Sequence, residues 1–360
     1  MLQDVVVVGG GIIGATIAWR LAQKGAQVTI IEAKRLGAGA STAGAGMLAP
    51  GAEASPGTPL GLQKVESLRL YAAYVEELSA EGRTPIDFRL CGAVEVARSA
   101  AEWQALSARA AAQRGIGIES QIVQGAELPG LVGSEVGGAV EGAMFYPHDS
   151  IVDPRELMKA LGVACRRAGV WIAEQEQAQS LQVMERQVCV RTAASTRMAA
   201  AVVLAAGAWS TEIPLKGPGS AAAPPRAYPV RGHLVGFRAA PGRLGPILRH
   251  GHTYLLQRGS GEIVAGTTEE TVGFNARLDE ARIADITGRA AALLPLLAAV
   301  PRESAWNGFR PAVESDAPVV RRWNDTPLWL AYGHYRNGLL LAPLTAQIVV
   351  SEISANLGMA

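Results

Sequence analysis

Three glycines directly after an apolar run constrain this chain more than any other feature. Residues 5–8 are four consecutive valines, and Gly9, Gly11 and Gly14 follow with the spacing Gly-x-Gly-x-x-Gly. A helical apolar pattern comes next, and a second apolar run occupies residues 28–31. A strand, a helix and a second strand, the first strand wholly and the second largely apolar, predict a βαβ unit with parallel strands.

This unit has the full pattern of a dinucleotide site. Gly9 is expected to form the tight turn, Gly11 to let backbone amides reach a pyrophosphate, and Gly14 to let the helix pack on the strand. Glu32, 18 residues after Gly14, ends the second strand and can accept hydrogen bonds from ribose hydroxyls. The acid disfavours the 2′-phosphate of NADP, but leaves both FAD and NAD open. The alternative is a simple glycine turn beside a surface carboxylate.

Later segments predict two sheets of different kinds. Residues 201–207 have the pattern of another short buried strand that ends in Gly207 and fits the parallel sheet, and residues 328–332 have the pattern of one more strand. Between residues 229 and 267 apolar and polar positions alternate between glycine-rich turns, which is typical of an antiparallel sheet. We therefore expect an α/β fold with a Rossmann-like domain and a second α+β domain built on an antiparallel sheet.

Local signals locate several other elements. Helical spacing predicts a helix over residues 62–79, and residues 90–97 have the pattern of a strand. Ser99 with Glu102 forms a capping box at the start of another helix. Asp153 before a proline predicts a helix that runs to about Ala168.

Charge and cysteine content exclude several classes of protein. The formal net charge is +1, so the chain has no strong field for nucleic acid or anionic lipid. Cys91, Cys165 and Cys189 are too widely spaced for a CxxC site and are expected to be reduced core thiols, and no metal site is expected. No uninterrupted apolar run reaches the ~20 residues of a membrane span, and the first residues lack the pattern of a secretory signal. These features predict a soluble cytoplasmic protein.

Several longer stretches carry a family resemblance. They are Val5 to Gly14 with Glu32, Gly39 to Pro50, Leu204 to Ser210, Tyr228 to Gly232, Gly308 to Pro311 and Gly333 to Pro343. Together they resemble the FAD-dependent amino acid and amine oxidases related to D-amino acid oxidase, and most of all the glycine oxidases of thiazole (thiamine) biosynthesis. The resemblance spans nearly the whole chain. It implies an FAD-binding domain from residues 1–85, 141–215 and 308–360, and a substrate-binding domain from residues 86–140 and 216–307.

The resemblance also implies which residues contact the cofactor. The expected FAD-binding residues are Gly9, Gly11, Ile12, Ile13, Gly14, Glu32, Ala33, Ser41, Thr42, Ala45, Gly46, Met47, Ala206, Gly207, Trp209, Gly333, Tyr335, Arg336, Asn337, Gly338 and Leu339. Amides at the start of the C-terminal helix are expected to stabilise negative charge on the reduced flavin. Relatives that attach flavin covalently use a cysteine near the position of Arg310. None lies there, so the FAD is expected to be non-covalent.

The expected catalytic residues are Arg310, Tyr254, Arg336, His252 and Met47. By resemblance, Arg310 and Tyr254 hold the substrate carboxylate, Arg336 supplies a second positive charge, and the other two line the pocket. From spacing alone, Arg310 would be a surface salt-bridge arginine and Tyr254 a half-buried strand tyrosine. Thr268 departs from a methionine in the glycine oxidase pattern, which leaves the size and polarity of the pocket open.

The implied activity is oxidative deamination of a small amino acid, with glycine favoured. Hydride transfer from the substrate to FAD would give an imine, then glyoxylate and ammonia, and oxygen would reoxidise the flavin to give hydrogen peroxide. Alternatives within the same fold are a D-amino acid or sarcosine oxidase, or a dehydrogenase that uses another electron acceptor. An NAD-linked dehydrogenase and a non-catalytic nucleotide-binding subunit also remain open. The resemblance implies a homo-oligomer.

Overall fold

The computed structural model describes residues 4–217, 223–315 and 317–359, and the predicted βαβ unit opens the chain. Strand β1 (Asp4–Val8), helix α1 (Ile12–Gln23) and strand β2 (Gln27–Glu32) follow one another, and β1 pairs with β2 in parallel. The buried side chains of β1 lie on both faces of the strand, as its unbroken run of valines predicts.

Strand β1 lies inside a six-stranded sheet with the order β20-β21-β13-β1-β2-β9. The other members are β13 (Ala201–Leu204), β21 (Leu328–Tyr332), β9 (Trp171–Glu174) and β20 (Val319–Arg322). Five strands are parallel, and β20 pairs antiparallel with β21 at one edge. The predicted strands at residues 201–207 and 328–332 are confirmed, although the first ends at Leu204 because the chain turns into a short 3₁₀ helix at Gly207.

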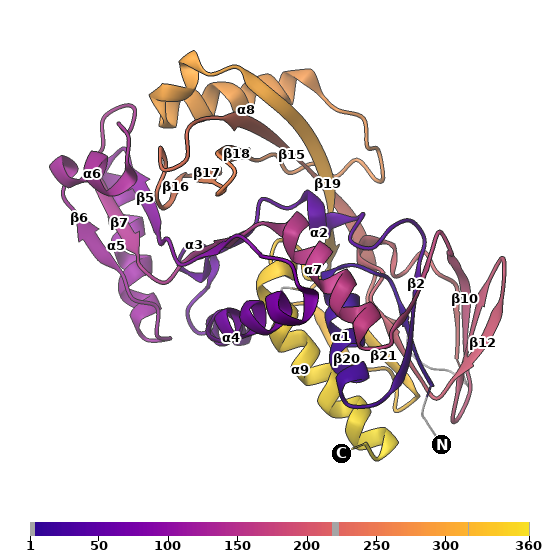
Figure 1. The fold of residues 1–360 in the computed structure, drawn as a ribbon. Coiled ribbons are helices and arrows are strands. Elements are labelled where there is room, and N and C mark those ends of the chain that lie inside the picture. Colours follow the sequence, from indigo (N-terminus) through magenta and orange to yellow (C-terminus); the bar gives the residue numbers. More distant parts are fainter. Residues whose placement is uncertain (1–3, 218–222, 316, 360) are drawn as a thin grey trace.

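Both faces of this sheet are covered. On one face lie α1, α4 (Pro59–Gly82), α7 (Pro154–Arg167) and α9 (Gly338–Leu357), the group at the lower centre of Figure 1. The other face packs on a small sheet of β10 (Ala178–Val183), β11 (Val188–Thr192), β12 (Thr196–Ala199) and β14 (Leu215–Lys216). The parallel sheet is therefore the middle layer of three.

An eight-stranded sheet forms the upper part of Figure 1, with the order β19-β15-β18-β17-β16-β5-β7-β6. Its strands are β19 (Arg302–Val313), β15 (Ala227–Arg238), β18 (Glu262–Gly266), β17 (Thr253–Gln257), β16 (Ile247–His250), β5 (Ala93–Ala97), β7 (Gly142–Tyr146) and β6 (Gln121–Val123). All pairs are antiparallel except β16 with β5. The predicted antiparallel pairing between residues 229 and 267 is confirmed.

Helix α8 (Glu280–Leu293) covers one face of the eight-stranded sheet through Ile283 and Ile286. The opposite face contacts α5 (Ala100–Arg114) and the loop that contains Ala45 and Ala49. Shorter elements complete the fold: β3 (Met47–Leu48), β4 (Phe88–Arg89), β8 (Ser150–Val152), α2 (Ala40–Ala43), α3 (Pro50–Glu53), α6 (Leu128–Val132), η1 (Gly125–Glu127), η2 (Gly207–Trp209) and η3 (Pro295–Ala299). The fold class predicted from the sequence is thus confirmed, whereas the division into two domains stays a prediction.

Most of the local signals are also confirmed. The Asp153 side chain accepts hydrogen bonds from the amides of Arg155 and Glu156 at the start of α7. The hydroxyl of Ser99 accepts from Glu102, although the carboxylate of Glu102 accepts from Arg98 rather than from Ser99. The predicted strand over residues 90–97 is shorter than expected, because the chain joins the sheet only at Ala93.

Helix α9 is the one described helix whose length and hydropathy would suit a membrane span. Most of its residues are buried inside the protein, where Leu340, Val349 and Ile353 join the core beside α1. Its apolar surface is therefore used in packing, and we treat α9 as a core helix.

Candidate active site

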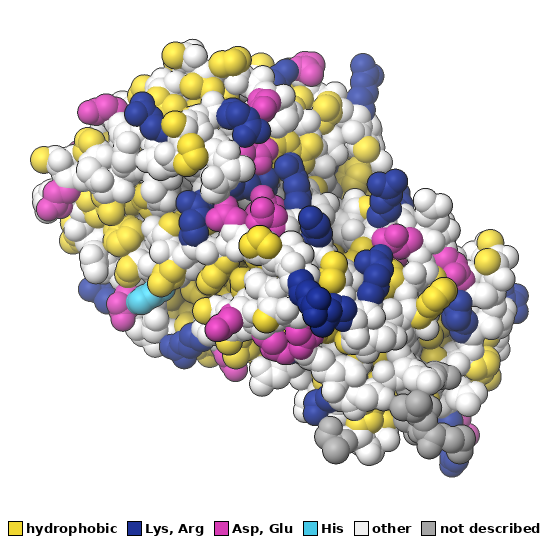
Figure 2. All heavy atoms as spheres, viewed as in Figure 1, with side chains coloured by type: hydrophobic (Ala, Val, Ile, Leu, Met, Phe, Trp, Pro, Cys, Tyr) yellow, Lys and Arg dark blue, Asp and Glu magenta, His cyan; other side chains and the backbone are white. Residues whose placement is uncertain are grey.

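A cavity of about 1380 Å³ lies between the two large sheets. This volume exceeds the ~300–1,000 Å³ of pockets for drug-sized ligands, so it has room for a dinucleotide with a second small molecule. Its walls come from β1, the start of α1, residues 38–49, β17, β19 and the start of α9. On the face drawn in Figure 2, acidic and basic side chains lie side by side around a central hollow, without a large patch of one sign.

The glycine turn is built as the sequence predicts. At Gly9, φ is +109°, and a Cβ atom would lie 2.4 Å from the carbonyl oxygen of Ala205. A Cβ atom on Gly14 would lie 2.1 Å from the carbonyl oxygen of Gly9. The two glycines therefore let β1, α1 and the end of β13 pack closely, which brings the N-terminus of α1 to the cavity.

The first turn of α1 has one amide already bound and one available. Ile12 donates its amide hydrogen to the Oγ of Ser41 (2.9 Å), and the first bond within the helix is donated by Ala15 to Gly11. The amide of Ile13 lines the cavity without an acceptor in the described part of the chain. An N-terminus of this kind suits a phosphate.

Glu32 also lies on the cavity wall, and its carboxylate organises the loops around it. One oxygen accepts from the amide of Gly10 (2.7 Å) and the other from the amide of Lys34 (2.8 Å). Each carboxylate oxygen keeps a further lone pair, so the group can still accept hydrogen bonds from ribose hydroxyls.

Helix α9 presents a second N-terminus to the same cavity. Asn337 provides no side-chain cap, and the first intrahelical bond runs from the Leu341 amide to the Asn337 carbonyl (2.8 Å). Gly338, Leu339 and Leu340 line the cavity, and their amides have no acceptor among residues 4–217, 223–315 and 317–359. The positive end of a 20-residue helix therefore faces the cavity. Two helix N-termini, a glycine turn and a ribose-accepting acid fit FAD.

Most of the predicted cofactor residues line this cavity, and three do not. Gly14 serves the packing described above, and the hydroxyl of Thr42 donates to the carbonyl of Gly37 (2.8 Å). Gly333 lies against Val313, where a Cβ atom would be 2.6 Å from a methyl group. The roles of the lining residues as FAD ligands stay predictions. None of Cys91, Cys165 and Cys189 lines the cavity, which is consistent with non-covalent FAD.

Arg310 reaches the opposite part of the cavity from β19. Its guanidinium passes over Gly232 of the neighbouring strand, where a Cβ atom would lie 2.4 Å from Nη1 and from Nη2. Nη1 donates to the carbonyl oxygen of Thr268 (2.9 Å) and Nη2 to the Oγ1 of Thr267 (2.8 Å). No described carboxylate forms an ion pair with Arg310. Its charge is therefore left for an anion in the cavity.

Tyr254 lies beside this cation on β17, and its ring covers Gly266 of β18. Burial raises the pKa of Tyr254 to about 12, against the opposing effects of the Arg310 charge and of a hydrogen bond with Thr267. The phenol is therefore neutral near pH 7, and can donate a hydrogen bond to the same anion that Arg310 attracts.

The remaining predicted catalytic residues also line the cavity, in different environments. Met47 is half-buried on β3, and His252 is exposed in the turn between β16 and β17. Arg336 lies 3.3 Å from Glu269 and 3.8 Å from Glu53, so its charge is already offset. The structure thus brings all five residues to one cavity but leaves only the Arg310 guanidinium without an acidic partner.

Sequence reasoning missed other parts of the wall. Thr267 and the segment from Gln177 to Gln179 line the cavity, yet no local pattern marks them because tertiary pairing alone brings them there. His334 is buried, and its Nε2 shares a hydrogen bond with the hydroxyl of Thr345 (3.0 Å). Desolvation lowers the pKa of His334 to about 3. It is therefore a neutral structural residue rather than a cation at this site.

Comparison with known proteins agrees with the geometry. A family model described as FAD dependent oxidoreductase matches residues 4–352. Glycine oxidase of Geobacillus kaustophilus is 32% identical over 354 residues, which are 97% of this chain and 92% of that protein. The bifunctional protein ThiO/ThiG of Synechocystis is 33% identical over 356 residues, covering 96% of this chain and 51% of that protein.

Solved structures give the same result. The crystal structure of glycine oxidase from Geobacillus kaustophilus superposes with a TM-score of 0.91 at 30% identity, covering 98% of this chain and 95% of that one. Iminodiacetate oxidase from Chelativorans has a TM-score of 0.86 at 22% identity over 99% of this chain and 96% of that one, which shows a shared fold. The chain therefore belongs to the family of FAD-dependent oxidoreductases, and its cofactor is FAD.

Proposed function

We propose that this protein oxidises the amine of a small amino acid, glycine before others, to the imine. The observation that carries the proposal is the Arg310 guanidinium, which lies in the cavity without an acidic partner in the described chain and beside the neutral phenol of Tyr254. A guanidinium can hold a carboxylate through two parallel hydrogen bonds, and the phenol can add a third. The similarity to glycine oxidases supports glycine as the substrate.

The protein's own part in the reaction is placement and exclusion of water. Arg310 and Tyr254 would fix the carboxylate, so that the amine and Cα of a small substrate take one position against the cofactor. Met47 and Leu234 supply apolar surface on the same cavity wall. FAD, when bound, would supply the acceptor for the hydride equivalent that leaves the substrate, and molecular oxygen with a proton would take up this equivalent to give hydrogen peroxide. The imine then takes up water to give glyoxylate and ammonia.

The setting of the reaction is part of the same proposal. The names of the bifunctional ThiO/ThiG relatives support a role in supplying the thiazole of thiamine. The cytoplasmic location is part of the proposal on the sequence features alone. We also propose that the protein associates into a homo-oligomer, because its sequence resembles those of the glycine oxidases. Molecular oxygen or another electron acceptor would be the second partner.

The test is the visible absorbance of the FAD-loaded protein under anaerobic conditions. Adding glycine should bleach the oxidised flavin band, and readmitting air should restore it with release of hydrogen peroxide. The Arg310→Ala variant should keep its FAD but lose roughly 100-fold or more in kcat/KM, because two charge-assisted hydrogen bonds to the substrate are removed. Flavin that stays oxidised with glycine, sarcosine and D-amino acids alike would refute amine oxidation.

Other outcomes separate the alternatives. Faster bleaching with sarcosine or a D-amino acid would change the substrate and keep the reaction. Bleaching by glycine without peroxide in air would identify a dehydrogenase that passes its electrons to another acceptor. An unaltered rate in the Arg310→Ala variant would exclude Arg310 as the anchor.

A further inference from the structure

One short segment of the cavity wall holds the guanidinium of Arg310. Thr267 and Thr268 follow β18, and they accept hydrogen bonds from Nη2 and Nη1 of the guanidinium, through a hydroxyl and a carbonyl oxygen respectively. A guanidinium has five N–H groups in a fixed plane, so binding two of them along one edge sets the direction of the others. The position of this segment therefore determines where Arg310 can receive a carboxylate.

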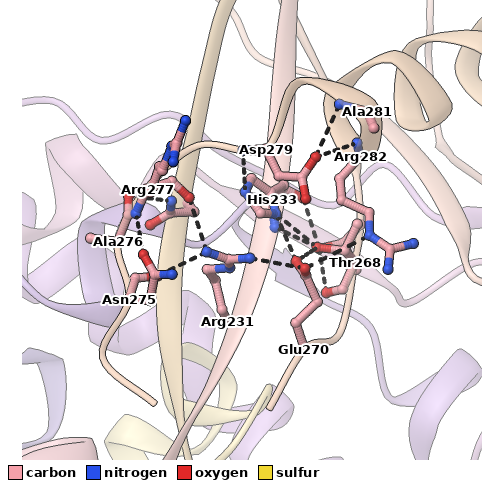
Figure 3. A network of polar contacts seen from close by, with 12 residues as sticks. Arg231, His233, Thr268, Glu270, Asn275, Ala276, Arg277, Asp279, Ala281 and Arg282 are labelled. Atoms are coloured by element: carbon pink, nitrogen blue, oxygen red, sulfur yellow. Dashed lines mark hydrogen bonds and ion pairs between the residues drawn. The ribbon is translucent and has the colours of Figure 1, made fainter. Parts of the chain in front are cut away.

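A polar network holds Thr268 in place (Figure 3). Its centre is Glu270, whose carboxylate accepts hydrogen bonds from Nη2 of Arg231 (2.9 Å) and from Oγ1 of Thr268 (3.0 Å). Nδ1 of His233 also lies 3.0 Å from this carboxylate. Arg282 reaches it from α8 at 3.7 Å. Backbone hydrogen bonds in both directions between Arg231 and Glu270 tie the segment to β15.

Thr268 is the link between the network and Arg310. Its carbonyl oxygen accepts from Nη1 of Arg310, while its hydroxyl donates to Glu270 and accepts from the backbone amide of His233 (3.0 Å). The His233 ring is fully buried, and its Nε2 accepts from the amide of Asp279 (3.3 Å). In the neutral ring this leaves the proton on Nδ1, which faces Glu270 and the Thr268 hydroxyl.

The network also keeps negative charge away from Arg310. Desolvation would raise the pKa of Glu270, but the hydrogen bonds from Arg231 and Thr268 outweigh it and lower the pKa overall. Glu270 is therefore ionised near pH 7, and Arg231, only 5% exposed, lies against it. Glu269 is engaged by Arg336 in the same way. Both acids next to the segment are thus paired with arginines other than Arg310.

We propose that Glu270, His233 and Thr268 are positioning residues for substrate binding. They hold the Thr267–Thr268 segment so that it accepts one N–H from Nη1 and one from Nη2 of Arg310 and leaves the remaining N–H groups for a monocarboxylate in the cavity. The inference rests on the proposed function for the identity of the ligand, but it makes a separate claim about how the anion site is built.

The test is the Thr268→Val variant, which keeps the shape of the side chain and removes the hydroxyl. Acetate binds as a carboxylate without being oxidised, so calorimetric titration of acetate into the FAD-loaded protein measures the anion site alone. We expect the dissociation constant of acetate to rise roughly 10-fold, as for loss of a hydrogen bond to a charged group. The KM for glycine should rise by a similar factor while kcat changes less than about 3-fold.

Three further variants keep the test decisive. Thr268→Ser restores the hydroxyl and should return acetate binding to within about 2-fold of the parent protein. Thr271→Val removes the hydroxyl of an exposed residue in the same loop and should change nothing. Glu270→Gln should weaken acetate binding as Thr268→Val does, because it removes the charge that holds Arg231.

The possible failures are distinguishable. Parental acetate affinity in both Thr268→Val and Glu270→Gln would overturn the positioning role, even if glycine is oxidised normally. A different result would be that no amine reduces the flavin, while acetate binds and the Thr268→Val substitution weakens acetate binding. In that case the positioning role stands and the proposed oxidation fails. A fall in kcat alone, with acetate binding and KM unchanged, would also contradict the inference.

Discussion

At the scale of single residues, Asp149 is a buried acid whose ionisation the fold resists. One oxygen accepts from the amide of Gly51 (3.0 Å), and the other lies 3.5 Å from Nη2 of Arg249. Burial nevertheless raises the pKa of Asp149 to about 6, because desolvation outweighs the favourable effect of Arg249. Between about pH 4 and pH 6 the folded protein therefore holds a proton that the unfolded chain has released.

This predicts a specific dependence of stability on pH. Since the folded state binds more protons in that window, the contribution of Asp149 to the free energy of unfolding is present at pH 4 and falls as the pH rises to 6. At ~1.4 kcal/mol per pH unit the change is roughly 3 kcal/mol. Relative to the parent, the Asp149→Asn variant should gain stability by about this amount between pH 4 and pH 7 in urea titrations. A constant difference between the two proteins across that range would contradict the shift.

The candidate site shows which residues a sequence can identify. Gly9, Glu32 and Arg310 lie in stretches that carry recognisable patterns, and all three line the cavity. In the sequence, Thr268 stands out only as a departure from the methionine of the glycine oxidase pattern. Its contacts with His233 and Glu270 depend on how β15 pairs with the loop after β18, and this pairing has no local signal in the sequence.

At the scale of elements, two helices begin with an aspartate cap, yet the two caps should contribute different amounts to the free energy of unfolding. Asp279 accepts from two amides at the start of α8. Asp153 does the same for α7, and its carboxylate also lies 3.4 Å from Nε of Arg258, which is almost fully buried. Removing an aspartate cap costs ~1 kcal/mol, and weakening a buried ion pair adds to that cost.

The Asp279→Ala variant should therefore lose about 1 kcal/mol of unfolding free energy, and Asp153→Ala about 2–3 kcal/mol. Chemical denaturation of the two variants, at equal FAD concentration, measures the difference. Arg258 keeps Glu262 as a partner at 2.5 Å in either variant, which limits the additional loss of unfolding free energy in Asp153→Ala. Equal losses would mean that the Asp153–Arg258 contact contributes nothing to stability.

Element boundaries were predictable where one residue type controls them. Asp153 and Pro154 define the start of α7, and the valine run defines β1, because capping and burial act locally. Strand β9 at the edge of the parallel sheet and the sheet of β10, β11 and β12 were not predicted. Trp171 in β9 is 66% exposed, so the buried pattern that marks the central strands is absent there.

At the scale of the whole molecule, the cavity depends on contact between parts of the chain that belong to different sheets. Trp209 follows β13 of the parallel sheet, and Phe309 lies in β19 of the eight-stranded sheet. Phe274, in the loop that leads from β18 to α8, stacks on Trp209 with ring centroids 4.8 Å apart and planes inclined by 17°. It also contacts Phe309 edge-on at 5.6 Å. Trp209 and Phe309 both line the cavity, so Phe274 connects two of its walls from outside.

Loss of this connection should weaken FAD binding more than it weakens the fold. An aromatic pair contributes about 0.5–1.5 kcal/mol, which corresponds to roughly a 2- to 10-fold change in a dissociation constant. We expect the Phe274→Ala variant to release FAD more readily by that factor, measured by fluorescence of the freed flavin, while the melting temperature of the apoprotein stays close to the parental value. Leu278→Ala is the matched control, since Leu278 lies in the same loop with similar exposure, 40% against 38%. If both variants lose FAD equally, the loop as a whole rather than the Phe274–Trp209 contact holds the two walls together.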